Sequence, residues 1–120
     1  MKRYKQNHGI MGNNGEVVKC GLEVKEGQVT KWGETTGDIF MAILGNCSLQ
    51  TQNDSIQGGR CYQAIESAKG KEFIEIEEGT HDWLVPIAEK VTPPLFRING
   101  NLVYLFVKDG FEKAQQPKET

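Results

Sequence analysis

Three cysteines and the histidine that lies outside the N-terminal segment are the side chains best suited to covalent or metal chemistry. They are Cys20, Cys47, Cys61 and His81. Zinc sites usually bring their ligands in closely spaced pairs such as C-x2-C, and no two of these four residues stand so close. A buried thiol behaves as a small apolar group, and Cys47 and Cys61 fall on apolar stripes typical of a core. We therefore predict structural thiols, with no metal, no cofactor and no catalytic residue.

His81 stands beside Asp82, which could orient its imidazole as a general base toward a cysteine nucleophile. Adjacent residues rarely hold that geometry, so Asp82 is interpreted instead as a helix-capping or turn residue. An enzyme of unidentified class remains one alternative function.

A glycine pair followed by an arginine is a candidate site for an anion. Gly58, Gly59 and Arg60 stand at the start of a helix predicted over residues 59–69. Exposed backbone N–H groups at a helix start, together with a guanidinium, can hold a phosphate or a carboxylate. Arg97 is a second cation for the same role. The pattern lacks the longer glycine motif and the lysine of a P-loop, and a plain turn with a solvated arginine also fits it.

The strongest charge asymmetry is an acidic stretch that contains neither lysine nor arginine. Its acidic residues are Glu72, Glu75, Glu77, Glu78, Asp82 and Glu89. In a strand, Phe73, Glu75 and Glu77 would share one face. With Asp82 and Trp83 they form a candidate surface for a partner protein with a basic surface. A solvated face that protects an exposed strand from aggregation explains the same pattern.

Composition limits the classes of partner. The chain has 120 residues, 14 basic and 16 acidic, with a formal net charge of -2. A dedicated binder of nucleic acid or of anionic membranes normally carries a basic excess, so neither is expected. No apolar run approaches the roughly 20 residues of a membrane span. The basic N-terminus is not followed by the apolar stretch of a signal peptide, which favours a cytoplasmic protein with reduced cysteines.

The first half of the sequence predicts a hairpin and two short helices. Apolar β-branched runs flank the turn at residues 25–27, which is the pattern of a β-hairpin. Residues 36–50 take helical spacing, with Thr35 or Thr36 as cap and Asp38 in the first turn. Gly70 is expected to end the helix over 59–69.

The second half is ambiguous between helix and strand. Residues 72–78 alternate as a strand does, while residues 83–91 fit either a helix stripe or a returning strand. Residues 95–107 carry an Asn99-Gly100 hairpin signal and strand-forming valines, but Pro93-Pro94 and Gly110 are also helix start and stop signals. We favour a hairpin there. The short helix, the Ile/Glu strand and the further amphipathic stretch together resemble small accessory proteins encoded by phages, without a motif that identifies a family.

These observations predict one α+β domain over residues 16–111, with an N-terminal β-hairpin, two short helices and antiparallel strands in the second half. Residues 1–15 are expected to be a flexible lead-in and residues 112–120 a flexible tail. The leading hypothesis is a non-catalytic, protein-binding module, able to form a homo-oligomer, that docks through its acidic and aromatic surface. The alternative is a protein that binds a nucleotide or phosphate through Gly58, Gly59, Arg60 and Arg97.

Overall fold

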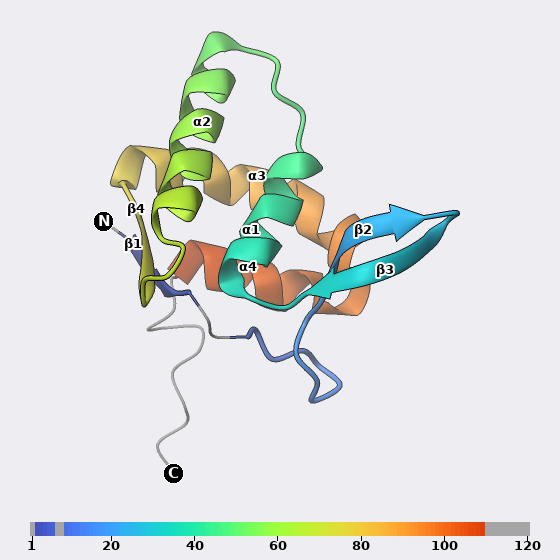
Figure 1. Ribbon diagram of the computed structural model, residues 1–120. Helices are drawn as coiled ribbons and strands as arrows, with labels where there is room; N and C mark the ends of the chain where they lie inside the picture. The colour runs from blue at the N-terminus through green and yellow to red at the C-terminus, as the bar shows by residue number, and fades with distance from the viewer. Residues whose placement is uncertain (1, 7–8, 110–120) are drawn as a thin grey trace.

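The computed structural model describes residues 2–6 and 9–109. Helices and antiparallel strands share one small body, as predicted (Figure 1). The elements in chain order are β1 (Lys2–Lys5), β2 (Cys20–Lys25), β3 (Gln28–Gly33), α1 (Thr36–Gly45), α2 (Gln52–Ser67), β4 (Phe73–Ile76), α3 (Glu78–Phe96), the 3-10 turn η1 (Arg97–Asn99) and α4 (Gly100–Asp109).

The predicted hairpin is confirmed as β2 and β3. Glu26 and Gly27 have φ angles of 53° and 78°, the left-handed values that tight two-residue hairpin turns require. The hairpin projects away from the helices in Figure 1. Val24 and Trp32 are exposed on it, so little of its apolar surface is used in the core.

The first two helices begin where local chemistry dictates. Thr35 caps α1 and exchanges hydrogen bonds with Asp38 in a capping box, which confirms the predicted cap. Thr51 and Asp54 form the same arrangement at the start of α2. That second box places the start of α2 at Gln52, well before the start predicted at Gly59.

The predicted hairpin over residues 95–107 is wrong. Those residues complete α3, pass through η1 and form α4. Pro86, Pro93 and Pro94 are all exposed, so the carbonyls that lose a helical N–H partner can turn to water. Arg97, with φ of 55°, breaks the helix, and Gly100 lets α4 pack close to α3. Burial of Val103, Phe106 and Val107 on one helical face outweighs the local preference for strand.

The N-terminal strand was not foreseen. Lys2–Lys5 pairs antiparallel with β4, and Tyr4 lies opposite Ile74. Tyr4 is fully buried, with ring centroids 4.7 Å from Phe40 and 5.5 Å from Phe106. The flexibility predicted for residues 1–15 stays a prediction, but Tyr4 and Ile10 from this segment are part of the core. The predicted tail at 112–120 lies outside the described residues.

The core is apolar and joins all the helices to the β1–β4 pair. Its members include Tyr4, Phe40, Ile43, Cys61, Ile65, Ile74, Ile76, Leu84, Ala88, Val103 and Phe106. Ile74 and Ile76 are buried on one face of β4, while Glu75 lies on the opposite, exposed face. In the part of the chain that the structure describes, no helix is both long enough and apolar enough to cross a membrane.

Candidate functional site

A polar cavity of about 520 Å³ lies where α2, β4 and the start of α3 meet. Its lining residues, which we call the acidic cavity, are Arg60, Gln63, Ala64, Ser67, Glu75, Glu77 and Thr80. Glu75 comes from β4, whereas Glu77 is the N-cap residue of α3 and so lies beyond the strand on which it was predicted. The cavity therefore gathers two of the predicted acidic residues with a predicted cation.

Two charged side chains of the acidic cavity have no ion-pair partner among the described residues. Among residues 2–6 and 9–109, neither Arg60 nor Glu77 forms an ion pair with another side chain. Glu75 is within 3.5 Å of the Arg3 guanidinium, and both side chains are about half exposed. Solvent weakens an ion pair of that kind. With two carboxylates and one guanidinium in its lining, the cavity has a net negative charge.

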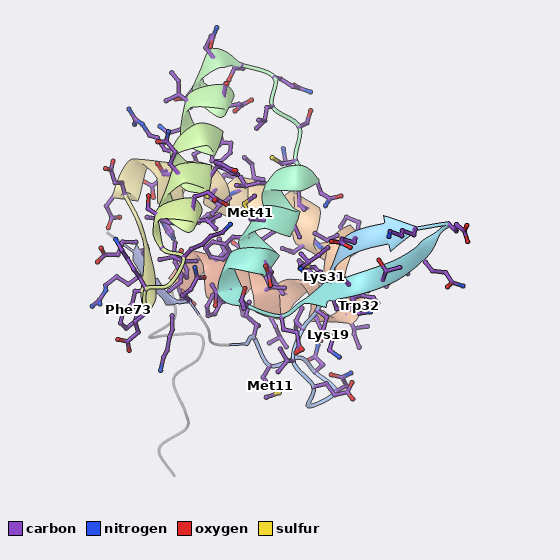
Figure 2. All side chains as sticks on the ribbon, viewed as in Figure 1. Met11, Lys19, Lys31, Trp32, Met41 and Phe73 are labelled. Carbon is purple, nitrogen blue, oxygen red and sulfur yellow. The ribbon has the colours of Figure 1, made fainter. Side chains whose placement is uncertain are left out.

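Phe73 is not an open aromatic surface. The Arg3 guanidinium stacks over its ring at 4.0 Å from the centroid, and the side chain is half-buried. Figure 2 shows Phe73 on the opposite side of the molecule from Trp32 on the hairpin. Arg3 thus shields the aromatic part of the predicted surface, leaving the carboxylates as its exposed part.

The predicted anion site is not formed as expected. Gly58 and Gly59 lie in the interior of α2, where backbone N–H groups bond within the helix. They are therefore not available at a helix start. Arg97 lines a different, smaller cavity of about 220 Å³ together with Asn14 and Asn99. Hence the four residues of the anion-binding alternative do not converge on one site.

Trp83 also leaves the predicted surface. Its indole Nε1 donates to Asp54 Oδ1 at 3.0 Å, and its ring lies beside Gly58. It lines a second cavity of about 470 Å³, bordered by Cys47 and Lys90 among others. The bond from Trp83 and backbone N–H groups lower the pKa of Asp54 below its ordinary value.

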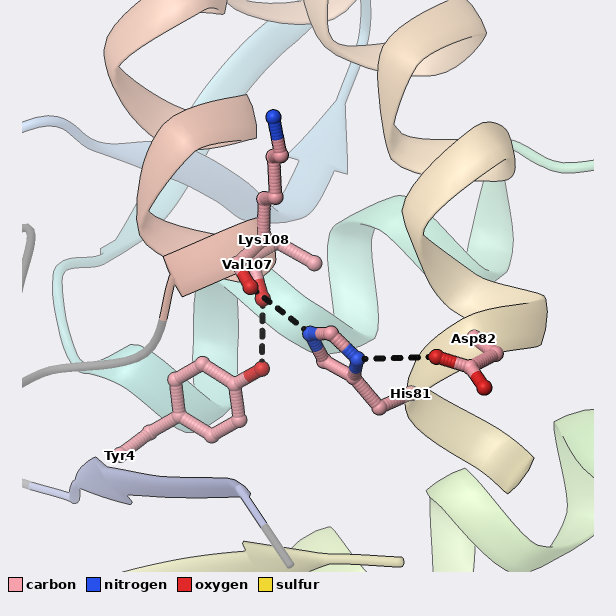
Figure 3. Close-up of polar contacts among 5 residues, drawn as sticks. All are labelled: Tyr4, His81, Asp82, Val107 and Lys108. Carbon is pink, nitrogen blue, oxygen red and sulfur yellow. Dashed lines mark hydrogen bonds and ion pairs between the residues drawn. The ribbon is translucent and has the colours of Figure 1, made fainter. Parts of the chain in front are cut away.

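His81 and Tyr4 hold the C-terminal end of α4 (Figure 3). His81 Nε2 lies 2.9 Å from the Lys108 carbonyl oxygen, and the Tyr4 hydroxyl donates to the Val107 carbonyl at 2.6 Å. Burial raises the pKa of Tyr4 well above its usual range, so its hydroxyl keeps the proton that it donates. Asp82 is exposed beside His81 and caps no helix. This network is a structural use of His81 that sequence spacing did not predict.

The cysteines are poor nucleophiles in this fold. Burial raises the pKa of Cys61 to about 12 and that of Cys20 to about 11. Burial also raises the pKa of Cys47, which is only half-buried and follows the end of α1 instead of lying on its core face. In the described part of the chain, no hydrogen bond joins a cysteine to a histidine.

Arg3 and Thr80 are the site residues that sequence reasoning missed. Arg3 reaches Glu75 only because β1 pairs with β4, and residues at the N-terminus carried no signal for that pairing. Thr80 is buried and donates to Gln57 Oε1 at 2.8 Å, which ties α3 to α2 at the cavity wall.

Comparison of the chain with family models, with curated proteins and with solved structures finds no match.

Proposed function

We propose that this is a non-catalytic interaction protein that takes a basic side chain of a partner protein into the acidic cavity. The observation that carries the proposal is that Glu75 and Glu77 both line a 520 Å³ cavity, and that Glu77 forms no ion pair with a described side chain. Its volume is within the range of roughly 300–1,000 Å³ typical of ligand sites. A lysine or arginine entering there would meet two carboxylates.

The other residues that line the cavity also suit a basic segment of a partner protein. Arg60 would repel the incoming cation, but it can also bind a carboxylate or a carbonyl beside the basic group. Gln63, Ser67 and Thr80 add uncharged polar groups around the charges. A short basic segment of a protein offers both a cation and backbone carbonyls, so it matches this lining better than a lone anion does.

The same geometry speaks against the anion-binding alternative. Two glutamates face any ligand that reaches Arg60, and the glycine N–H groups lie in the helix interior. A phosphate in the cavity would have to overcome repulsion from both carboxylates.

A binding assay with matched peptides tests the proposal. The probes are a fluorescently labelled peptide that alternates lysine with glycine, and the same peptide with each lysine replaced by glutamate. We expect the lysine peptide to bind the wild-type protein, and the paired substitution Glu75→Gln/Glu77→Gln to weaken it about tenfold or more. The pair Glu34→Gln/Glu89→Gln removes the same charge from exposed positions outside the cavity and is the control.

The control variant distinguishes an effect of the charges in the cavity from an effect of the net charge of the protein. If both double variants weaken binding equally, the effect belongs to the net charge of the molecule and the cavity assignment fails. Preferential binding of the glutamate peptide would instead support an anion site at Arg60.

A further inference from the structure

Three potential metal ligands come together on the first turns of α3, outside the acidic cavity. They are Glu78, His81 and Asp82, and one ligand atom from each lies within 4.8 Å of the others. Residues spaced i, i+3 and i+4 share one face of a helix, which explains the cluster. The spacing of the cysteines and histidines in the sequence gives no signal for this carboxylate–histidine set.

The hydrogen bond of the His81 ring fixes the role of its other nitrogen. A carbonyl oxygen only accepts hydrogen bonds, so Nε2 must donate to Lys108 at 2.9 Å. In the neutral ring, Nδ1 then carries a lone pair. The His81 residue is 7% exposed, and its Nδ1 is buried without a hydrogen-bond partner among the described residues.

The distance from His81 Nδ1 to Asp82 Oδ1 distinguishes a hydrogen bond from a pair of metal ligands. The two atoms are 3.5 Å apart (Figure 3). A charge-assisted N–H···O hydrogen bond is normally about 2.7–2.9 Å, so this contact is too long for one. Two ligands bonded to one tetrahedral ion at about 2.0–2.1 Å are separated by about 3.4 Å. A lone pair and a carboxylate oxygen repel each other at this spacing unless a cation lies between them.

We propose that Glu78, His81 Nδ1 and Asp82 form a binding site for a divalent transition metal, with Zn²⁺ as its best-fitting ion. An imidazole nitrogen suits Zn²⁺ and its neighbours in the first transition row, whereas Mg²⁺ and Ca²⁺ prefer oxygen ligands alone. In metal-bound histidines, the second ring nitrogen usually donates a hydrogen bond to a carbonyl or carboxylate oxygen. Here the acceptor is the backbone carbonyl oxygen of Lys108. Asp82 is largely exposed, so the site opens to solvent on one side.

Calorimetric titration with Zn²⁺ of the full chain, freed of metal by chelation, tests the site. We expect one ion per chain, with Mg²⁺ producing no comparable heat. Asp82→Asn and Glu78→Gln should each weaken Zn²⁺ binding about tenfold or more. Glu89→Gln removes a carboxylate from the same helix outside the cluster, and His8→Gln removes the chain's other histidine; both should leave binding unchanged.

A spectroscopic measurement reports on the ring itself. On addition of Zn²⁺, the ¹⁵N resonance of His81 Nδ1 should move as a metal-bound nitrogen does, while Nε2 remains protonated. The proposal is overturned if the chain binds no Zn²⁺ up to millimolar concentration, if Asp82→Asn binds as tightly as wild type, or if Nδ1 keeps a proton in the presence of Zn²⁺. None of these results depends on the binding of a basic partner in the acidic cavity.

Discussion

At the scale of single residues, the hydrogen bond between Trp83 and Asp54 determines the pKa of a carboxyl group and can be tested by one substitution. The Trp83 indole donates to Asp54, and this bond is the largest cause of the lowered pKa of that carboxyl. Because the folded-state pKa lies below the unfolded value of about 3.9, ionised Asp54 stabilises the fold above that pH. The contribution is lost as the pH falls through the lower, folded-state pKa.

Trp83→Phe should therefore raise the pKa of Asp54 toward its ordinary value. The phenyl ring keeps apolar contact but has no N–H to donate. Observation of the Asp54 carboxyl by NMR during an acid titration measures the shift. Trp32→Phe, on the exposed hairpin, is the control. An unchanged Asp54 pKa in the Trp83 variant would mean that the hydrogen bond does not form in solution.

The thiols should differ in reactivity. Cys61 is fully buried with its pKa raised to about 12, whereas half-buried Cys47 borders the 470 Å³ cavity. Since the thiolate is the reactive form, alkylation at pH 8 should modify Cys47 first and Cys61 only after unfolding. Mass spectrometry of the labelled peptides gives both rates. Native labelling of Cys61 at the rate of Cys47 would show that the core opens far more readily than this packing allows.

At the scale of elements, substitutions at two glycines test helices α2 and α4. The start of α2 and the helical structure of α4 both differ from the prediction. A side chain added at Gly59 would meet nothing within 4 Å, in the interior of α2. Gly59→Ala should therefore stabilise the protein by about 0.5–1 kcal/mol, because alanine is the better residue in a helix. At Gly100 an added Cβ would lie 2.8 Å from the Pro93 Cα, so Gly100→Ala should destabilise the α3–α4 packing.

Urea denaturation of the two alanine variants measures both effects. The midpoint should rise for Gly59→Ala and fall for Gly100→Ala. A Gly59 variant less stable than wild type would favour the start of α2 that was predicted at Gly59. A neutral Gly100 variant would show that α4 does not approach α3 as closely at Gly100 as this packing requires.

The elements were predictable where the determining contacts are local. The threonine cap before α1 and the turn within residues 25–27 are signalled by neighbouring residues, and the structure has Thr35 as the cap and Glu26 and Gly27 in the turn. Strand β1 and helix α4 depend on distant contacts, above all on Tyr4 reaching Phe106 and Val107. Local preference is a weak guide where such burial decides the structure.

At the scale of the whole molecule, the site was predictable only in part for the same reason. The acidic stretch pointed to Glu75 and Glu77, and the structure keeps these two in one cavity. Arg60 joins them because α2 packs beside β4, and Trp83 leaves them because it turns toward α2. The exposed hairpin with Val24 and Trp32 lies on another side of the molecule (Figure 1) and is the natural rival as a docking surface.

A ¹H–¹⁵N correlation spectrum recorded during titration with the lysine–glycine peptide tests the central claim most directly. The account predicts that amide shifts concentrate on Gln63, Ser67, Glu75 and Glu77, and that the Glu75→Gln/Glu77→Gln variant loses them. The response should weaken as salt is added, because the attraction is electrostatic. Shifts confined to the β2–β3 hairpin, or no shifts around the acidic cavity at millimolar peptide, would contradict it.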